Sequence, residues 1–181
     1  MNKISVEMFC KLYKTQSKGH DKTFTDFLKK HITTEYIEFL KKDVICDGII
    51  KATSYVKDGE REFVKINSSL RYLFFVMKLI ELYTDIDIDG EHIAEQYDEL
   101  NKIGAVAMLL GGIPDSHVEF IPESEYAEFS TILNMKLDDL RDNEYSTTAL
   151  VYNLKNSVQL SEEVINSALE RVINDKEAVE E

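Results

Sequence analysis

The chain has 181 residues and a formal net charge of -13, from 34 acidic and 21 basic side chains. This excess of acids excludes a protein that holds nucleic acid by neutralising its phosphates. With 7 glycines and 2 prolines, the chain is also poor in the residues that the turns of a β-sandwich or barrel require. A hydrophobic fraction of 44% predicts a globular protein with a sizeable core.

Neither end of the sequence predicts a membrane protein or a secreted one. The first residues lack the apolar region and the small-residue cleavage site of a secretory signal. No run of about 18 apolar residues occurs, so we expect no membrane span. In a cytoplasmic protein, Cys10 and Cys46 are expected to be buried thiols and not a disulfide.

The first third of the chain predicts three helices. Ser5 is a suitable N-cap for a helix that runs to about Lys14. A second, short helix carries Phe24, Phe27, Leu28 and Ile32. Thr33 or Thr34 is expected to cap a longer third helix that ends near Thr53. Its predicted core-facing side chains are Tyr36, Ile37, Leu40, Val44, Ile45, Ile49 and Ala52.

Residues 55–66 predict a short β-hairpin, because Asp58-Gly59 stands between two short apolar runs and suits a tight turn. Asn67-Ser68-Ser69 then signals the start of a helix. Residues 70–83 are apolar nearly all round, which is typical of a helix at the centre of a bundle.

Further helices are predicted after the break at 85–90. One carries Ile93, Tyr97 and Leu100 and ends at Gly104, and a short apolar segment follows at 105–110. Pro122 opens a helix whose predicted apolar face is Tyr126, Phe129, Leu133, Leu137 and Leu140. Two more helical stretches are expected to begin at Ser146 and near Ser161.

These elements predict a mainly α protein, a single-domain helical bundle with one short β-hairpin near residues 55–66. We expect one helical domain over 1–174 and an acidic, frayed tail over 175–181.

The segment Asp85, Asp87, Asp89 and Gly90 has the spacing that opens a calcium loop. Two later positions depart from that pattern. Position 12 is Gln96 where a bidentate Glu is needed, and position 8 is His92 where an apolar residue is usual. A connection between helices, with Asp89 as the cap of the next one, is the favoured interpretation, and calcium is the alternative.

The sequence shows no pattern that predicts catalysis or a bound cofactor. The four histidines lack zinc-binding spacing, and no dinucleotide-binding or P-loop motif occurs. Asp138 and Asp139 are paired carboxylates that could hold a metal, but a solvated helix face is the favoured interpretation. We therefore expect a protein that is not an enzyme.

The charge is distributed unevenly along the chain. Residues 1–66 contain 13 Lys and Arg against 10 Asp and Glu, a net of +3. Residues 67–181 contain 8 against 24, a net of -16. This uneven charge could attract a basic partner or favour head-to-tail association of copies of the chain. Alternatively, the acids only keep the helix surfaces solvated.

Three stretches carry a resemblance to a known class of proteins. They are 66–74 running into 82–85, 97–100 running into 112–114, and 128–129 running through 138–140 to 143–145. Together they resemble small helical proteins of tailed bacteriophages and prophages of Gram-positive bacteria, encoded among virion and tail-assembly genes. The resemblance covers about residues 1–150 and transfers no site residues. It implies a phage protein in the cytoplasm of the bacterial host.

The first hypothesis is therefore a chaperone-like or structural protein of virion or tail assembly, which covers a basic or apolar surface of another phage protein. A homo-oligomer is compatible with it, whereas direct nucleic-acid binding and membrane binding are not expected. The partner-binding candidates form an apolar stripe bordered by acids near the C-terminus: Glu162, Glu163, Val164, Ile165, Leu169, Glu170, Val172 and Ile173. Packing of that stripe on its own bundle is equally compatible.

The second hypothesis is an acidic inhibitor that mimics nucleic acid and blocks a host defence or nucleic-acid-processing protein. A metal-dependent enzyme that uses Asp85, Asp87 and Asp89, or the Asp138-Asp139 pair, is the third and weakest.

Overall fold

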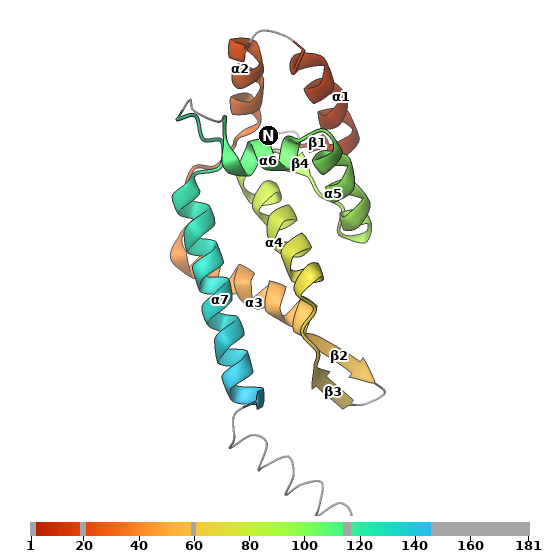
Figure 1. The fold of residues 1–181 in the computed structure, drawn as a ribbon, viewed down its shortest axis with the longest axis vertical. Helices are drawn as coiled ribbons and strands as arrows, with labels where there is room; N and C mark the ends of the chain where they lie inside the picture. The colour runs from red at the N-terminus through yellow and green to blue at the C-terminus, as the bar shows by residue number, and fades with distance from the viewer. Residues whose placement is uncertain (1–2, 19–20, 59–60, 114–116, 146–181) are drawn as a thin grey trace, which may run out of the picture. The chain divides into compact units, whose positions relative to one another are not determined.

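The computed structural model describes residues 3–18, 21–58, 61–113 and 117–145, and these form a mainly α-helical protein (Figure 1). The predicted fold class is confirmed. The elements in chain order are β1 (Ile4–Ser5), α1 (Val6–Gln16), α2 (Asp21–His31), α3 (Phe39–Ser54), β2 (Tyr55–Asp58), β3 (Arg61–Val64), α4 (Ser68–Tyr83), β4 (Ile86–Asp87), the 3-10 helix η1 (Gly90–His92), α5 (Ile93–Lys102), α6 (Ala105–Gly111) and α7 (Glu123–Tyr145).

The chain divides into two compact units, Met1–Lys136 and Leu137–Glu181. Of the second unit the structure describes the 137–145 stretch, the last part of α7. The predicted extents of the domain and of the tail, 1–174 and 175–181, stay predictions. Among the helices that the structure describes, none is both long enough and apolar enough to cross a membrane.

The N-terminal helices form as predicted and share an aromatic cluster. Ser5 caps α1, and its hydroxyl accepts a hydrogen bond from the Met8 amide at 3.3 Å. Phe9 on α1 is fully buried and stacks on Phe27 of α2, with ring centroids 5.7 Å apart. The ring of His31, the last residue of α2, lies edge-on to both phenylalanines. This cluster holds the two helices together.

Helix α4 is the central helix of the first unit. The side chain of Asn67 accepts a hydrogen bond from the Leu70 amide at 3.0 Å and so caps α4, as predicted. The second half of the helix is buried on several sides, at Phe75, Val76, Met77, Leu79, Ile80 and Tyr83. Helices α3 and α5 both pack against it. Figure 1 shows α4 running from the β2–β3 hairpin to β4.

The β2–β3 hairpin is confirmed, with Tyr55 opposite Val64 and Asp58 opposite Arg61. The structure adds a short parallel pair that the sequence did not predict, in which Ile4 of β1 lies opposite Ile86 of β4. The Ile4 amide also donates to the Asp85 carbonyl at 2.9 Å. This pair is missed from sequence because two-residue strands have no measurable alternation.

The predicted start of α3 is wrong, and its predicted core face is right only in part, since Ile37 and Ile49 are buried but Leu40 and Val44 are not. The helix begins at Phe39, five residues after Thr34, and residues 33–38 form a connection. Leu40 and Val44 were expected in the core but are 75% and 68% exposed. The prediction is right at Ile49, which is buried, and the other buried residues of the helix are Lys42, Cys46, Ile50, Thr53 and Ser54. The reason is that Lys42 faces the interior, which turns Leu40 and Val44 toward solvent.

The α5–α6 corner depends on two glycines. Gly104 ends α5 with φ 75°, as the sequence predicted for a C′ residue. Gly112 follows α6 with φ 70°. A Cβ at Gly112 would lie 2.2 Å from the Val118 carbonyl oxygen. Only glycine allows this approach of the two backbones.

A pair of glycine substitutions tests this corner. Gly112→Ala should lower the free energy of unfolding by 2 kcal/mol or more, taken as about 1–2 for the left-handed backbone plus the clash. The matched change is Gly48→Ala, in the middle of α3, where a Cβ meets no atom within 4 Å. It should stabilise the protein by about 0.5–1 kcal/mol. Urea unfolding followed by circular dichroism measures both. Equal effects of the two substitutions would contradict the corner geometry.

Candidate functional site

A buried lysine fixes the orientation of α3. The side chain of Lys42 is fully buried, and its Nζ lies 2.8 Å from Oε1 of Glu125 on α7. Nζ also donates to Oε2 of Glu128, one turn further along α7. The rings of Tyr36 and Phe129 lie 5.0 and 5.6 Å from the ammonium. The cation is therefore held by two carboxylates and two aromatic rings.

Glu125 is the acceptor on which this network converges. Its Oε2 accepts hydrogen bonds from the Ile37 amide at 3.0 Å and from the Tyr83 hydroxyl. One carboxylate thus joins α3, α4, α7 and the connection before α3. Since every polar atom of Glu125 has a partner, its near-complete burial is tolerated.

The surroundings shift the pKa values of all three groups. Burial alone raises the pKa of Glu125, but the hydrogen bonds from Lys42, Tyr83 and the Ile37 amide outweigh it, and the pKa is lowered. Burial likewise lowers the pKa of Lys42, but its bonds to Glu125 and Glu128 outweigh it, and the pKa is raised. Burial and the neighbouring carboxylates raise the pKa of the Tyr83 hydroxyl. Lys42 and Glu125 are thus both charged at neutral pH, and Tyr83 is a neutral donor.

Because Lys42 faces inward, the opposite side of α3 faces solvent. That side carries Leu40, Val44, Gly48 and Ala52, each four residues after the last, and all four are exposed. Helix α3 is consequently apolar on two sides, one packed and one open. We call this row of four residues the α3 ridge.

The α3 ridge borders an apolar pocket of about 530 Å³. Helix α4 contributes Phe74, Met77, Lys78 and Glu81 to its wall. The remaining wall consists of Ile45 and Ile49 of α3, Ile88, Gly90 of η1 and Ile93 of α5. All of these residues lie in the first unit. The pocket has the size and the lining to receive a few apolar side chains.

Some charged side chains around the α3 ridge form ion pairs and others do not. Lys78 and Glu81 at the pocket wall neutralise each other at 2.8 Å, and Lys136 of α7 neutralises Asp43 and Asp47. Lys41 and Lys51, by contrast, are exposed beside the ridge and form no ion pair with any residue that the structure describes. The open side of α3 is therefore apolar with two uncompensated positive charges.

The thiol of Cys46 on α3 is expected to be unreactive. Cys46 is fully buried on the packed side of α3, and its Sγ donates to the Phe129 carbonyl at 3.7 Å. Burial raises its pKa to about 11. The thiolate is therefore rare at neutral pH, and the expectation of a buried, unpaired thiol is confirmed for Cys46 and for Cys10.

The three aspartates of the calcium hypothesis have separate partners. Asp85 is hydrogen-bonded to His31 Nδ1 at 2.8 Å, Asp87 binds Lys3 Nζ at 2.9 Å, and Asp89 binds His92 Nδ1 at 2.8 Å. Asp89 also accepts from the Glu91 amide at 3.0 Å and so caps η1, in agreement with the favoured interpretation of a helix connection. The segment joins α4 to α5 and pairs with β1.

Within the described ranges, no three or more His, Cys, Asp or Glu side chains come together as a metal site. Asp138, of the Asp138-Asp139 pair, is exposed and lies 3.5 Å from Arg141. The C-terminal partner-binding candidates, from Glu162 to Ile173, lie outside the described residues.

The ridge, the pocket and the Lys42 network were all missed from sequence. One signal was present: α3 has apolar residues around most of its circumference, yet Lys42 stands among them. A helix with two apolar sides needs two partners, and the sequence does not say which side faces the core.

No protein-family model matches the chain, and no curated protein or solved structure is significantly similar to it.

Replacing Lys42 should test the network. Lys42→Met leaves the Glu125 carboxylate buried without its cation, which typically costs about 3–5 kcal/mol. For a chain of this length the melting temperature should fall by about 6–20 °C. The matched control is Lys41→Met, an exposed neighbour, where we expect a change within about 0.5 kcal/mol. Differential scanning calorimetry measures both, and similar shifts for the two variants would contradict the buried network.

The network also predicts how stability depends on pH. The folded-state pKa of Glu125 is below its ordinary value of 4.5, so its contribution is complete above pH 4.5 and is lost as the pH falls toward the folded-state pKa. Glu125→Gln should therefore lower the free energy of unfolding by about 2 kcal/mol at pH 7. The difference from wild type should shrink below pH 4.5, as urea titrations over a pH series would measure.

The control for this titration is Glu7→Gln, which removes the exposed ion pair of Glu7 with Lys11 on α1. Its effect should be smaller and should disappear in high salt, because the pair is solvated. A constant difference between wild type and Glu125→Gln down to pH 2 would show that Glu125 is not the titrating group.

Proposed function

We propose that this protein acts by binding another protein and not by catalysis, and that the α3 ridge and its pocket are the binding surface. The observation that carries the proposal is the open apolar side of α3, where Leu40 and Val44 are exposed beside a pocket of about 530 Å³. Neighbouring apolar side chains left in water are typical of an interaction surface.

The shape favours an amphipathic helix as the bound element. Burying one Leu or Val side chain fully is worth about 1.5–3 kcal/mol, whereas association costs about 4–15 kcal/mol in lost freedom. Burying two ridge side chains alone therefore does not supply enough free energy for stable binding. A partner helix that places several apolar side chains along the ridge and into the pocket supplies more.

The biological role that we propose is virion or tail assembly, as a chaperone-like or structural phage protein in the cytoplasm of the bacterial host. This part rests on the sequence resemblance described above. An assembly protein of this kind works by covering an apolar surface of its partner until the partner is incorporated, which is what an apolar ridge can do.

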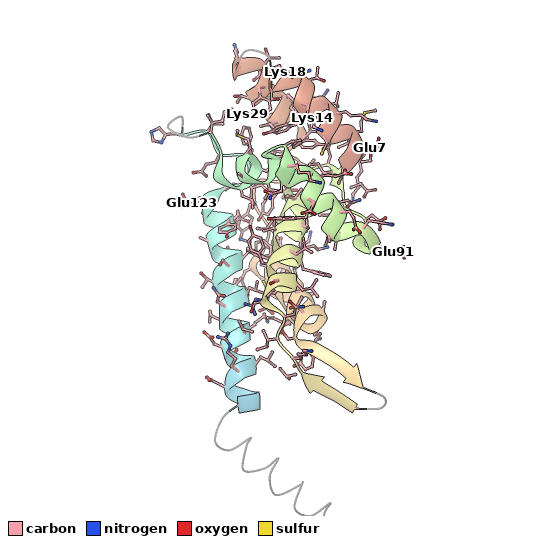
Figure 2. The ribbon with its side chains drawn as sticks, turned by 45° about the vertical axis from the view of Figure 1, so that its right-hand side comes forward. Glu7, Lys14, Lys18, Lys29, Glu91 and Glu123 are labelled. Carbon is pink, nitrogen blue, oxygen red and sulfur yellow. The ribbon has the colours of Figure 1, made fainter. Side chains whose placement is uncertain are left out.

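A second candidate is the acidic inhibitor that mimics nucleic acid. The observation that favours it is the net charge of -16 over residues 67–181. Figure 2 shows three basic side chains in the N-terminal part of the chain, Lys14 on α1, Lys18 just after α1, and Lys29 on α2. A mimic would bind through its acids and would not need the α3 ridge.

The two candidates predict different responses to one substitution. Val44→Asp should reduce the recovery of partner proteins at least tenfold, because it places a charge on the ridge. The matched control is Met8→Asp on α1, where a methionine is 52% exposed away from the ridge. The measurement is affinity capture with the tagged full chain from infected and uninfected bacterial cultures, compared between variants by quantitative mass spectrometry.

Phage structural proteins that bind wild type and Met8→Asp but not Val44→Asp support the assembly proposal. A host nuclease or defence protein, captured equally by all three and released by high salt, supports the inhibitor instead. Identical capture by wild type and Val44→Asp of any phage protein contradicts a role for the ridge.

A further inference from the structure

The charges beside the α3 ridge restrict what can bind there. Lys41 and Lys51 are exposed, and no described carboxylate pairs with either. The acids closest in sequence, Asp43 and Asp47, already pair with Lys136. A bound helix should therefore carry an apolar stripe and a net negative charge, since like charges opposite the lysines are unfavourable.

A segment near the C-terminus of the chain has this chemistry. Residues 161–173 hold six apolar positions with helical spacing, namely Val164, Ile165, Ala168, Leu169, Val172 and Ile173. The same residues include three glutamates and one arginine, a net charge of -2. Glu162 borders the apolar stripe on a helical projection. This segment lies outside the described residues, so its pattern is taken from the sequence.

We propose that residues 161–173 of a second copy of the chain bind along the α3 ridge, and that the exchange is mutual. This inference rests on the proposed function, because it names the partner of the same surface. Each copy offers one ridge and one stripe, so a two-fold axis satisfies both at once and leaves neither uncovered. Closed two-fold dimers are the commonest soluble oligomers. In the dimer the α3 ridge is covered, and a larger partner that competes for the ridge dissociates the dimer.

Oligomeric state tests the inference directly. Wild type should sediment as a dimer at micromolar concentration, whereas Val44→Asp and Leu169→Asp should each sediment as a monomer. Met8→Asp should remain a dimer. Circular dichroism should show the same helical content in all four full-length proteins, because Val44 and Met8 are exposed.

Mixing the two monomeric variants gives a sharper result. Val44→Asp keeps an intact stripe and Leu169→Asp keeps an intact ridge, so a mixed pair regains one of the two contacts. The mixture should form heterodimers with an affinity between those of wild type and either variant alone. No association in the mixture would overturn the exchange.

A charge swap tests the role of the lysines. Lys41→Glu with Lys51→Glu should weaken the dimer about tenfold or more, as several surface charge pairs are reversed. Adding Glu162→Lys in the same chain should restore part of the affinity, because Glu162 borders the stripe. Recovery with this added change requires that the two segments face each other. A further loss, or no change at either step, contradicts the proposed contact.

The failures of the two proposals are distinguishable. A wild-type monomer at all accessible concentrations overturns the exchange, as does a dimer that Val44→Asp leaves intact. In either case, loss of phage proteins from the Val44→Asp capture still supports the ridge as a binding surface. If Val44→Asp changes neither the oligomeric state nor the captured proteins, the α3 ridge has no role in binding.

Discussion

The burial of Lys42 is the constraint on which the first unit depends. A lysine with no exposed surface is tolerated only because Glu125 and Glu128 meet it from α7 and two aromatic rings flank it. Glu125 in turn needs the Tyr83 hydroxyl and the Ile37 amide. Removing Lys42 leaves the Glu125 carboxylate buried without its cation, and removing Glu125 leaves the buried Lys42 with Glu128 alone. The network therefore fixes the rotation of α3 relative to the end of α4 and the start of α7.

The open side of α3 follows from that rotation. In an ordinary amphipathic helix the apolar side chains would face inward, and Leu40 and Val44 would be in the core. Here the polar network takes the inner position at Lys42, while Cys46, Ile49 and Ile50 supply the apolar packing on the same side. The second set of apolar residues is thereby turned outward beside a pocket. A charged group in the interior is thus the physical cause of an apolar surface on the exterior.

Sequence reasoning recovered the features that depend on neighbouring residues. The caps at Ser5 and Asn67, the hairpin around Asp58, the glycine end of α5 and the central position of α4 are all local or compositional signals. It did not recover the features that join distant positions. Lys42 and Glu125 are 83 residues apart, and Ile4 and Ile86 are 82 apart. Without the position of Glu125 on α7, a lysine in an apolar stretch is predicted to be exposed, and Leu40 and Val44 are wrongly assigned to the core.

These long separations determine the order in which the protein can fold. The N-terminal strand has no partner until residue 86 has been made, and Lys42 has no buried counter-ion until residue 125 has been made. Contacts between such distant positions close large loops and form slowly. On the ribosome, α3 must keep Lys42 in water while most of the chain is still absent, and its inner side is then as exposed as its outer side. The emerging chain passes through a stage in which both the inner apolar residues of α3 and its outer ridge face solvent, and the pairing of Lys42 with α7 comes later.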